Sequence, residues 1–189
     1  MDIREMLEIL HLGERLKDTL RHSWTSQGRR ESVAEHSWRL SLMACLIRDE
    51  FPEADWEKVM TMAALHDMGE CFTGDIPAFW KTDADRATED RALDAWCGSL
   101  SKPLGDRVTA VFREMEAQET LEARIVKALD KLEVLIQHNE ADISTWIDVE
   151  YERNLMHADR YVEFSAFMQK LRDEVRSDTV AKIAREGKK

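Results

Sequence analysis

The sequence has 189 residues, enough to bury a substantial core and few enough for one domain. It is 43% hydrophobic and 34% charged, with only seven glycines and three prolines, as is typical of a soluble, helix-rich protein. A net charge of -11 argues against nucleic acid as the main partner, because binding a phosphate backbone needs a broad basic face.

The sequence also argues against export and membrane insertion. The longest uncharged stretch is too short to cross a bilayer, and residues 1–10 carry charges throughout. The cysteines Cys45, Cys71 and Cys97 form no CxxC pair, so they suit neither a zinc cage nor a disulfide framework. We therefore expect reduced thiols, a cytoplasmic protein and no membrane partner.

Apolar residues recur with a helical period along almost the whole chain, and almost no segment alternates as a strand would. A first helix is predicted over residues 3–20, followed by a polar loop over residues 21–31. Ser32 and Glu35 form a capping-box pattern that opens a second helix. We therefore predict an all-α, single-domain protein over residues 1–189. The remaining predicted helices span about 32–50, 55–68, 84–98, 106–117, 120–141 and 157–185.

Two histidines lie on the apolar faces of predicted helices. His36 shares a stripe with Leu40 and Met43, one turn after the helix begins. His66 ends the apolar stripe of the third helix, and Asp67 follows it directly. Taken alone, His36 is better explained as a core histidine bonded to a backbone carbonyl, and a His-Asp doublet is a weak signal.

Asp130 lies midway along a predicted helix that is apolar almost all round, on the side that carries Val126 and Val134. A buried carboxylate needs a cation or hydrogen-bond donors. Because Lys131 is expected to point elsewhere, an arginine from another helix is the structural alternative to a metal ion.

Together, His36, His66, Asp67 and Asp130 supply two imidazoles and two carboxylates from different helices or helix ends. Such a mixed set of nitrogen and oxygen ligands suits a divalent transition metal, whereas structural zinc usually takes thiolates. Two further carboxylates then remain beside the predicted ligands, where they suit general acid and base chemistry. These are Glu70 and Asp75.

The pattern H…HD…D resembles that of the HD-domain metal-dependent phosphohydrolases. Between residues 21 and 142, the segments "ESVAEHS", "HDMGECFTGDIP" and "KALDKLE" more closely resemble the 5′-deoxynucleotidase branch, which dephosphorylates deoxyribonucleoside 5′-monophosphates. The resemblance implies an HD-type helical bundle that forms a homodimer and acts on a nucleotide. It also implies one divalent metal ion, of which Co, Mn, Fe, Ni, Zn and Mg are the candidates.

The resemblance implies roles for individual residues. The four residues His36, His66, Asp67 and Asp130 would be metal ligands, and Glu70 and Asp75 would be the catalytic carboxylates.

The resemblance also implies that Arg21 grips the 5′-phosphate. Part of the family has an aromatic residue beside this arginine, which packs on the sugar and helps to exclude a 2′-hydroxyl. Here His22 takes the adjacent place and Trp24 follows three residues after Arg21, as in the eukaryotic-type members. Trp24 is therefore expected to offer an apolar face to the sugar or base, with a loop aromatic that fills the core as the alternative.

Two other functions remain open. One is another HD-type activity, namely a nucleoside triphosphate hydrolase, a cyclic-nucleotide phosphodiesterase or an oxygenase, although an oxygenase would need a second iron and more histidines. The other is a non-catalytic dimerisation module, against which the presence of Glu70 and Asp75 argues. The module would use a C-terminal apolar stripe, Tyr161, Phe164, Met168, Leu171 and Val175.

Overall fold

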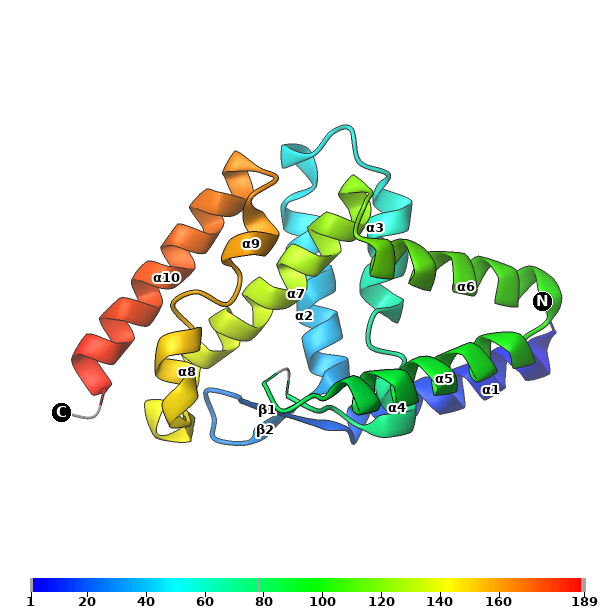
Figure 1. The fold of residues 1–189 in the computed structure, drawn as a ribbon, viewed down its shortest axis with the longest axis horizontal. Coiled ribbons are helices and arrows are strands. Elements are labelled where there is room, and N and C mark those ends of the chain that lie inside the picture. The colour runs from blue at the N-terminus through cyan, green and yellow to red at the C-terminus, as the bar shows by residue number, and fades with distance from the viewer. Residues whose placement is uncertain (1, 78, 188–189) are drawn as a thin grey trace.

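The computed structural model describes residues 2–77 and 79–187. The described residues are mostly helical, which confirms the predicted all-α class, and they include one short antiparallel hairpin (Figure 1). In chain order the elements are α1 (Ile3–Glu14), β1 (Leu20–Trp24), β2 (Arg30–Ser32), α2 (Val33–Leu46), α3 (Trp56–Leu65), α4 (Glu70–Thr73), α5 (Asp83–Ser99), α6 (Lys102–Ala117), α7 (Leu121–Glu140), α8 (Asp148–Arg153), α9 (Asp159–Val162) and α10 (Ala166–Glu186), with short 3₁₀ turns at Arg15–Lys17, Arg48–Glu50 and Ile143–Thr145.

Helix α7 is the centre of the molecule (Figure 1). It packs against α2, α3, α6, α9, α10 and strand β1. Its residues Ile125, Leu129, Leu132 and Leu135 are fully buried, as the apolar periodicity predicts. A buried polar side chain on α7 therefore needs a hydrogen-bond or ion-pair partner.

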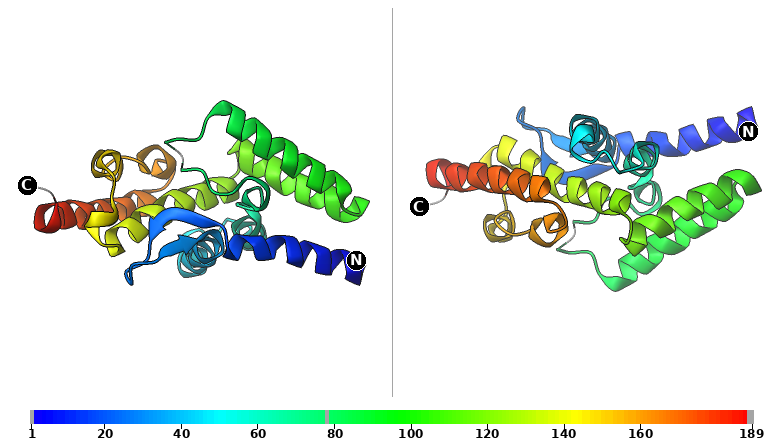
Figure 2. Two further views of the ribbon diagram at one scale, coloured as in Figure 1. Left: turned by 90° about the horizontal axis from the view of Figure 1, so that it is seen from below. Right: turned by 90° about the horizontal axis from the view of Figure 1, so that it is seen from above.

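Helices α5 and α6 pack against each other as a pair and extend from the body of the protein (Figure 2). A second, smaller apolar cluster lies where the first 3₁₀ turn, the start of α2 and α4 meet. Leu16, Val33, Met68 and Cys71 are its buried members. This cluster holds the segment after α3 in place beside the main core.

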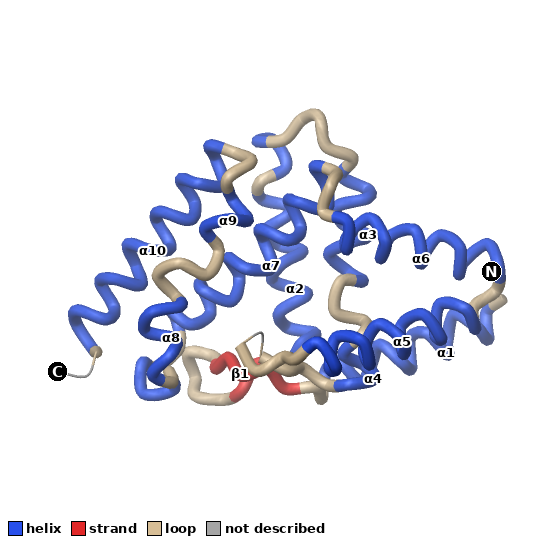
Figure 3. The backbone as a smooth tube through the Cα atoms, viewed as in Figure 1, coloured by secondary structure: helices blue, strands red, loops and turns tan. Residues whose placement is uncertain are grey.

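Residues 21–31 form a hairpin, so the predicted polar loop was wrong (Figure 3). Leu20 pairs with Ser32 and Trp24 with Arg30, and Gly28 supplies the positive φ of 78° that the turn needs. The residues of β1 that face inward are the polar Arg21 and Ser23, so the strand lacks the apolar alternation that reveals most strands.

The first predicted helix was too long, and the last one is interrupted. Helix α1 ends at Glu14 rather than at residue 20, because Gly13 weakens the helix and Thr19 bonds to the start of α2 instead. The predicted C-terminal helix is divided into α9 and α10, with Ser165 capping α10. Helix α6 begins at Lys102, four residues earlier than predicted, with Pro103 in its first turn.

The C-terminal stripe that suggested a dimerisation module belongs to the core. Met168 and Val175 are buried in the main apolar cluster, and Tyr161, Phe164 and Leu171 pack against it. Within the described part of the chain, no helix is both long enough and apolar enough to span a membrane.

The capping box predicted at Ser32 and Glu35 is present: the Ser32 hydroxyl accepts from the Glu35 amide and Glu35 accepts from the Ser32 amide. We expect Ser32→Ala to lower the free energy of unfolding by about 1 kcal/mol, the usual contribution of an N-cap. Chemical denaturation provides the measurement. Ser177→Ala, at an exposed position inside α10, is the matched control and should change stability little. Equal stability of the two variants would contradict this role of Ser32.

Candidate metal centre and active site

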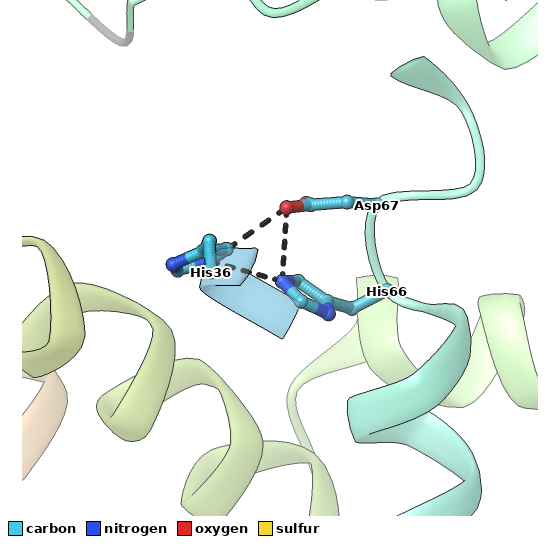
Figure 4. A group of neighbouring side chains, drawn as sticks. All are labelled: His36, His66 and Asp67. Carbon is cyan, nitrogen blue, oxygen red and sulfur yellow. Dashed lines mark hydrogen bonds and ion pairs between the residues drawn. The ribbon is translucent and has the colours of Figure 1, made fainter. Parts of the chain in front are cut away.

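Two helix termini bring two imidazole rings close together. His36 lies in the first turn of α2 and is fully buried, whereas His66 directly follows the last residue of α3. Their Nε2 atoms are 3.2 Å apart. The Asp67 Oδ2 atom lies 3.1 Å from His66 Nε2 and 3.6 Å from His36 Nε2, so these three side chains form one compact group (Figure 4).

The opposite nitrogen of each ring is already occupied. His36 Nδ1 contacts the Glu133 carboxylate on α7, and His66 Nδ1 lies 3.0 Å from the Ala63 carbonyl oxygen. Both acceptors suit a proton on Nδ1, and a neutral ring in this tautomer has a lone pair on Nε2. The two lone pairs and the Asp67 oxygen repel one another unless a positive charge lies among them.

Asp67 strengthens the case for a cation. Its Oδ2 atom is buried and has no hydrogen-bond partner among the described residues. Burial opposes ionisation of Asp67, but His66 and His36 outweigh burial and hold its pKa well below the usual range. An ionised oxygen without a hydrogen bond, beside two imidazole nitrogens, forms with them a donor set that fits a divalent metal ion.

A proton competes with the metal for His36. Burial and Arg21 both lower the pKa of His36, but Glu133 and Asp130 outweigh them and raise it to about 9. Because a metal ligand must be deprotonated, metal binding at this ring would release a proton.

Asp130 approaches the group from α7. Its Oδ1 atom is 3.5 Å from His36 Nε2, while its Oδ2 atom is 3.0 Å from Lys131 Nζ and 3.5 Å from Lys127 Nζ. The expectation that Lys131 points elsewhere was wrong, because the flexible lysine stem carries the ammonium back to its neighbour. One oxygen of Asp130 is therefore paired and the other faces the imidazoles.

The site opens into a cavity of about 750 Å³. Its walls come from β1, the segment after α3, α5, α6, α7 and α8. Arg21, Glu70 and Asp75 line this cavity together with His66, Asp67 and Asp130. The structure thus brings most of the predicted site residues to one cavity, with the buried His36 behind its wall.

Glu70 and Asp75 differ in their surroundings. Glu70 begins the short helix α4 and is 8% exposed, and its buried Oε2 atom lacks a hydrogen-bond partner in the described structure. Burial, followed by the charges of Asp67 and Asp75, raises the pKa of Glu70 to about 10. Asp75 is half-buried on the loop that Gly74 opens with a φ of 75°.

Arg21 points inward from β1 and is buried. Its Nη1 atom lies 3.6 Å from Asp67 Oδ2, and its Nε atom lies 3.3 Å from Glu31 Oε2. Burial opposes its charge, but Asp67 and Glu133 outweigh burial and raise the pKa of Arg21 above its usual value. Arg21 is therefore a permanent cation beside the candidate metal ligands.

Trp24 is not among the described residues that line the cavity. Its side chain is half-buried, and its carbonyl oxygen accepts a hydrogen bond from Gln137 on α7. His22 lines the cavity instead, with its ring centre 5.9 Å from the ring centre of Phe79. His22 and Phe79 therefore occupy the place beside Arg21 where an aromatic residue was expected.

Sequence reasoning missed the residues behind the imidazoles. Glu133 is fully buried; it contacts His36 Nδ1 and accepts a 2.7 Å hydrogen bond from Arg39 Nε. Glu31, His36 and Glu133 form a second group with metal-ligand spacing, but Glu133 and His36 already satisfy each other there. The available signal was Glu133 itself, which lies three residues after Asp130 on the same face of α7.

Comparison with protein families places these residues in context. The family model described as "HD domain" matches residues 13–172. The chain belongs to the HD-domain family. This membership confirms the resemblance that the H…HD…D pattern indicated.

Named relatives share most of the matched region. The chain is 34% identical to the 5'-deoxynucleotidase HDDC2 of Homo sapiens over 142 residues, which cover 72% of this chain and 68% of that protein. It is also 34% identical to the 5'-deoxynucleotidase HDDC2 of Danio rerio over 139 residues, or 71% and 68% of the two chains.

Solved structures share the fold over almost the full chain. One is a crystal structure of a "predicted metal-dependent phosphohydrolase" from Magnetospirillum magnetotacticum MS-1, with a TM-score of 0.80 and 26% identity over 98% of this chain and 94% of that chain. A conserved hypothetical protein from Pyrococcus furiosus matches with a TM-score of 0.72 and 28% identity, covering 90% of this chain and 99% of that chain.

Glu133 orients His36, so its loss should weaken metal binding without removing a ligand. We expect Glu133→Gln to reduce affinity for a divalent metal about 10- to 100-fold, the range found for partners of metal-bound histidines. Competition with a fluorescent chelator measures the change. Glu140→Gln is the control, since Glu140 also pairs with Arg39 but is exposed and does not contact His36. Unchanged affinity in Glu133→Gln would contradict this role.

Proposed function

We propose that the protein is a metal-dependent phosphohydrolase that releases phosphate from (deoxy)ribonucleoside 5′-monophosphates. The observation that carries this proposal is the cavity, because it joins imidazole and carboxylate ligands, a buried arginine and two further carboxylates. The names of the relatives in Homo sapiens and Danio rerio support the same activity.

We propose one divalent metal ion, held by His36, His66, Asp67 and Asp130. The mixed nitrogen and oxygen set admits Co, Mn, Fe, Ni, Zn or Mg. When bound, such an ion supplies a Lewis acid that polarises a phosphoryl oxygen and lowers the pKa of water.

Arg21 is proposed to bind the phosphate. A guanidinium presents parallel N–H donors that match two phosphate oxygens, and its charge offsets the negative charge that gathers on those oxygens. Its contacts with Glu31 and Asp67 hold the side chain in one orientation before substrate arrives. Arg21 is thus oriented to bind an anion beside the proposed metal ligands.

Glu70 and Asp75 are proposed to move the protons. In an in-line displacement, a water oxygen bonds to phosphorus as the bond from phosphorus to the 5′-oxygen breaks. One carboxylate accepts a proton from the water, and the other carboxyl group donates a proton to the leaving 5′-oxygen. The buried Glu70 and the half-buried Asp75 have different environments, which is the arrangement that separates an acid from a base.

The charges of the cavity support a monophosphate over a triphosphate. Among the described residues, seven lysine and arginine side chains line it, against nine aspartate and glutamate side chains. Even with a divalent ion, this balance leaves little positive charge for the larger charge of a triphosphate. The triphosphate hydrolase remains the second candidate among HD-type activities.

The homodimer and the cytoplasmic location are also proposals. The single chain leaves Trp38, Leu42 and Leu46 exposed at 66%, 42% and 76% along one face of α2, which supports a second copy. The three cysteines are free thiols, which supports a reducing compartment. Light scattering after size exclusion measures the first proposal directly.

Metal binding and turnover should be separable by mutation. We expect Asp130→Ala to lose metal and activity together, because its Oδ1 faces the imidazoles. Glu70→Gln should keep the metal and lose about 10²- to 10⁴-fold in turnover, the usual contribution of a general acid or base. Elemental analysis paired with phosphate release from dAMP measures both. Loss of metal in Glu70→Gln would make Glu70 a ligand, and stoichiometric metal in Asp130→Ala would remove Asp130 from the set.

Arg21→Ala should raise KM and lower kcat for dAMP, because the contact strengthens as charge redistributes in the transition state. Steady-state kinetics with dAMP, AMP and dATP measure this effect and the substrate class. Arg29→Ala is the control, since Arg29 is exposed and pairs with Glu35. A wild-type preference for dATP would move the protein to the triphosphate hydrolases, and equal kinetics for the two variants would remove Arg21 from the phosphate site.

Trp24→Ala provides the test of the sequence-based role of Trp24. Because Trp24 is absent from the described lining of the cavity, we expect this variant to keep the wild-type ratio of kcat/KM for dAMP and AMP. His22→Ala should change that ratio, since His22 faces the cavity. The opposite pattern would restore Trp24 as the residue that selects the sugar.

A further inference from the structure

The cavity has a second polar wall, made by α8 and the residue that follows it. Glu150 and Asn154 line this wall, and they are only 2% and 3% exposed. They are four residues apart, so their side chains lie on one face of the helix. His138 and Ser23 lie beside them and also line the cavity.

His138 fixes the orientation of Asn154. Its Nδ1 atom lies 3.1 Å from Asn154 Oδ1, and its Nε2 atom lies 3.3 Å from Ser23 Oγ. Burial lowers the pKa of His138, so the ring is neutral. With its proton on Nδ1 it donates to the Asn154 carbonyl oxygen and accepts from the Ser23 hydroxyl, which turns the Asn154 Nδ2 group to the other side.

Glu150 and Asn154 each keep one polar side-chain atom without a hydrogen bond among the described residues. Glu150 Oε2 accepts from the Ile147 amide at 2.8 Å. Glu150 Oε1 is buried without a hydrogen bond and has two imidazole neighbours, His22 Nε2 at 3.3 Å and His138 Nε2 at 3.6 Å. Asn154 Nδ2 is likewise buried and unbonded. The wall therefore presents one acceptor and one donor that make no hydrogen bond among the described residues, and such buried groups call for a hydrogen-bond partner.

Neighbouring helices hold this wall in place. Arg172 on α10 is 1% exposed; it donates to the Asn154 carbonyl oxygen at 3.1 Å and pairs with Asp159 at 2.9 Å. Trp146 donates to the His138 carbonyl oxygen at 3.0 Å. The donor and acceptor are thus positioned before any ligand arrives, which favours specific binding.

An aromatic face lies next to the same wall. The centre of the Phe79 ring lies 5.9 Å from the ring centre of His22 and 4.8 Å from that of Trp80. The Arg153 guanidinium lies 5.7 Å from the centre of the Phe79 ring. His22, Phe79 and Arg153 all line the cavity. Flat rings beside a small number of directed polar atoms are the usual lining of a site for a small ligand.

We propose that Glu150 and Asn154 are specificity-determining residues that bind the nucleoside part of the substrate. Glu150 Oε1 accepts a hydrogen bond from a donor on the nucleoside, and Asn154 Nδ2 donates one to an acceptor beside that donor. His22 and Phe79 pack on the flat part of the ligand. This inference rests on the proposed phosphohydrolase function. Two parts of a nucleotide offer that chemistry, the edge of the base and the 3′-hydroxyl of the sugar.

Two substitutions reverse the polarity of the wall at almost constant size. Glu150→Gln retains an oxygen for the Ile147 amide but presents N–H donors where the acceptor was. Asn154→Asp retains an oxygen for His138 but replaces the donor with an acceptor. Glu152→Gln makes the same change of charge at an exposed position of α8 and is the matched control. Thermal unfolding and metal content verify that each variant is folded.

The measurement is kcat and KM for phosphate release from dAMP, 2′,3′-dideoxy-AMP and 2-deoxyribose 5-phosphate. For dAMP, we expect Glu150→Gln and Asn154→Asp to raise KM about 10- to 100-fold, by more than any fall in kcat, as for loss of a buried hydrogen bond. The increase should vanish with dideoxy-AMP if the 3′-hydroxyl is the partner, and with deoxyribose phosphate if the base is the partner. Glu152→Gln should match the wild type throughout.

Three results would overturn the inference. The first is wild-type kinetics for dAMP in both polarity variants, and the second is an increase in KM that persists with both truncated substrates. In those cases the wild type still hydrolyses dAMP, so the proposed function stands and only the nucleoside site fails. The third is absence of phosphate release from every substrate by the metal-loaded wild type, which overturns the proposed function and this inference together.

Discussion

Two imidazole nitrogens 3.2 Å apart, both facing a buried carboxylate oxygen, are stable together only around a positive charge. Each ring is held there by a bond from its other nitrogen, to Glu133 for His36 and to the Ala63 carbonyl for His66. The convergence of α2, the end of α3 and the middle of α7 produces this arrangement. The core around α7 therefore has a functional consequence, because it fixes the candidate ligands in place without a metal ion.

The charged side chains that surround the two imidazoles in the core are paired with side chains of opposite charge. Glu133 is fully buried and is paired with His36 and Arg39, and Asp130 is paired with Lys127 and Lys131. Removing one member of a buried pair leaves an uncompensated charge, which strongly destabilises a protein. The network around the site thus serves both stability and orientation, which explains why polar side chains persist on an otherwise apolar helix.

The helices and the ligand candidates were predictable because their signals are local. The apolar stripes around His36 and His66 and the nearly all-apolar helix around Asp130 located the residues that the structure brings together. The hairpin at residues 21–31 was not predictable from period, since its buried side chains are the polar Arg21 and Ser23. The formation of β1 depends instead on its pairing with β2, which follows the turn.

Contacts between distant segments account for the remaining differences. The partnership of Glu133 with His36 joins residues 97 positions apart, and Ser23 meets His138 across 115 positions. Lys131 was placed wrongly because a helical period positions Cβ atoms and not the end of a flexible side chain. Trp24 was expected at the cavity from its spacing to Arg21, but His22, two residues earlier on the same face of the strand, lines the cavity in its place.

X-ray absorption spectroscopy tests the convergence of the ligands most directly. It is recorded at the absorption edge of the metal that supports the fastest phosphate release. The structure predicts a single-ion environment with two imidazole nitrogens and with carboxylate or water oxygens, and no sulfur. In His36→Ala, one imidazole contribution should disappear from the spectrum. A first shell without imidazole, or one containing thiolate sulfur, would contradict the assignment of His36 and His66 as ligands.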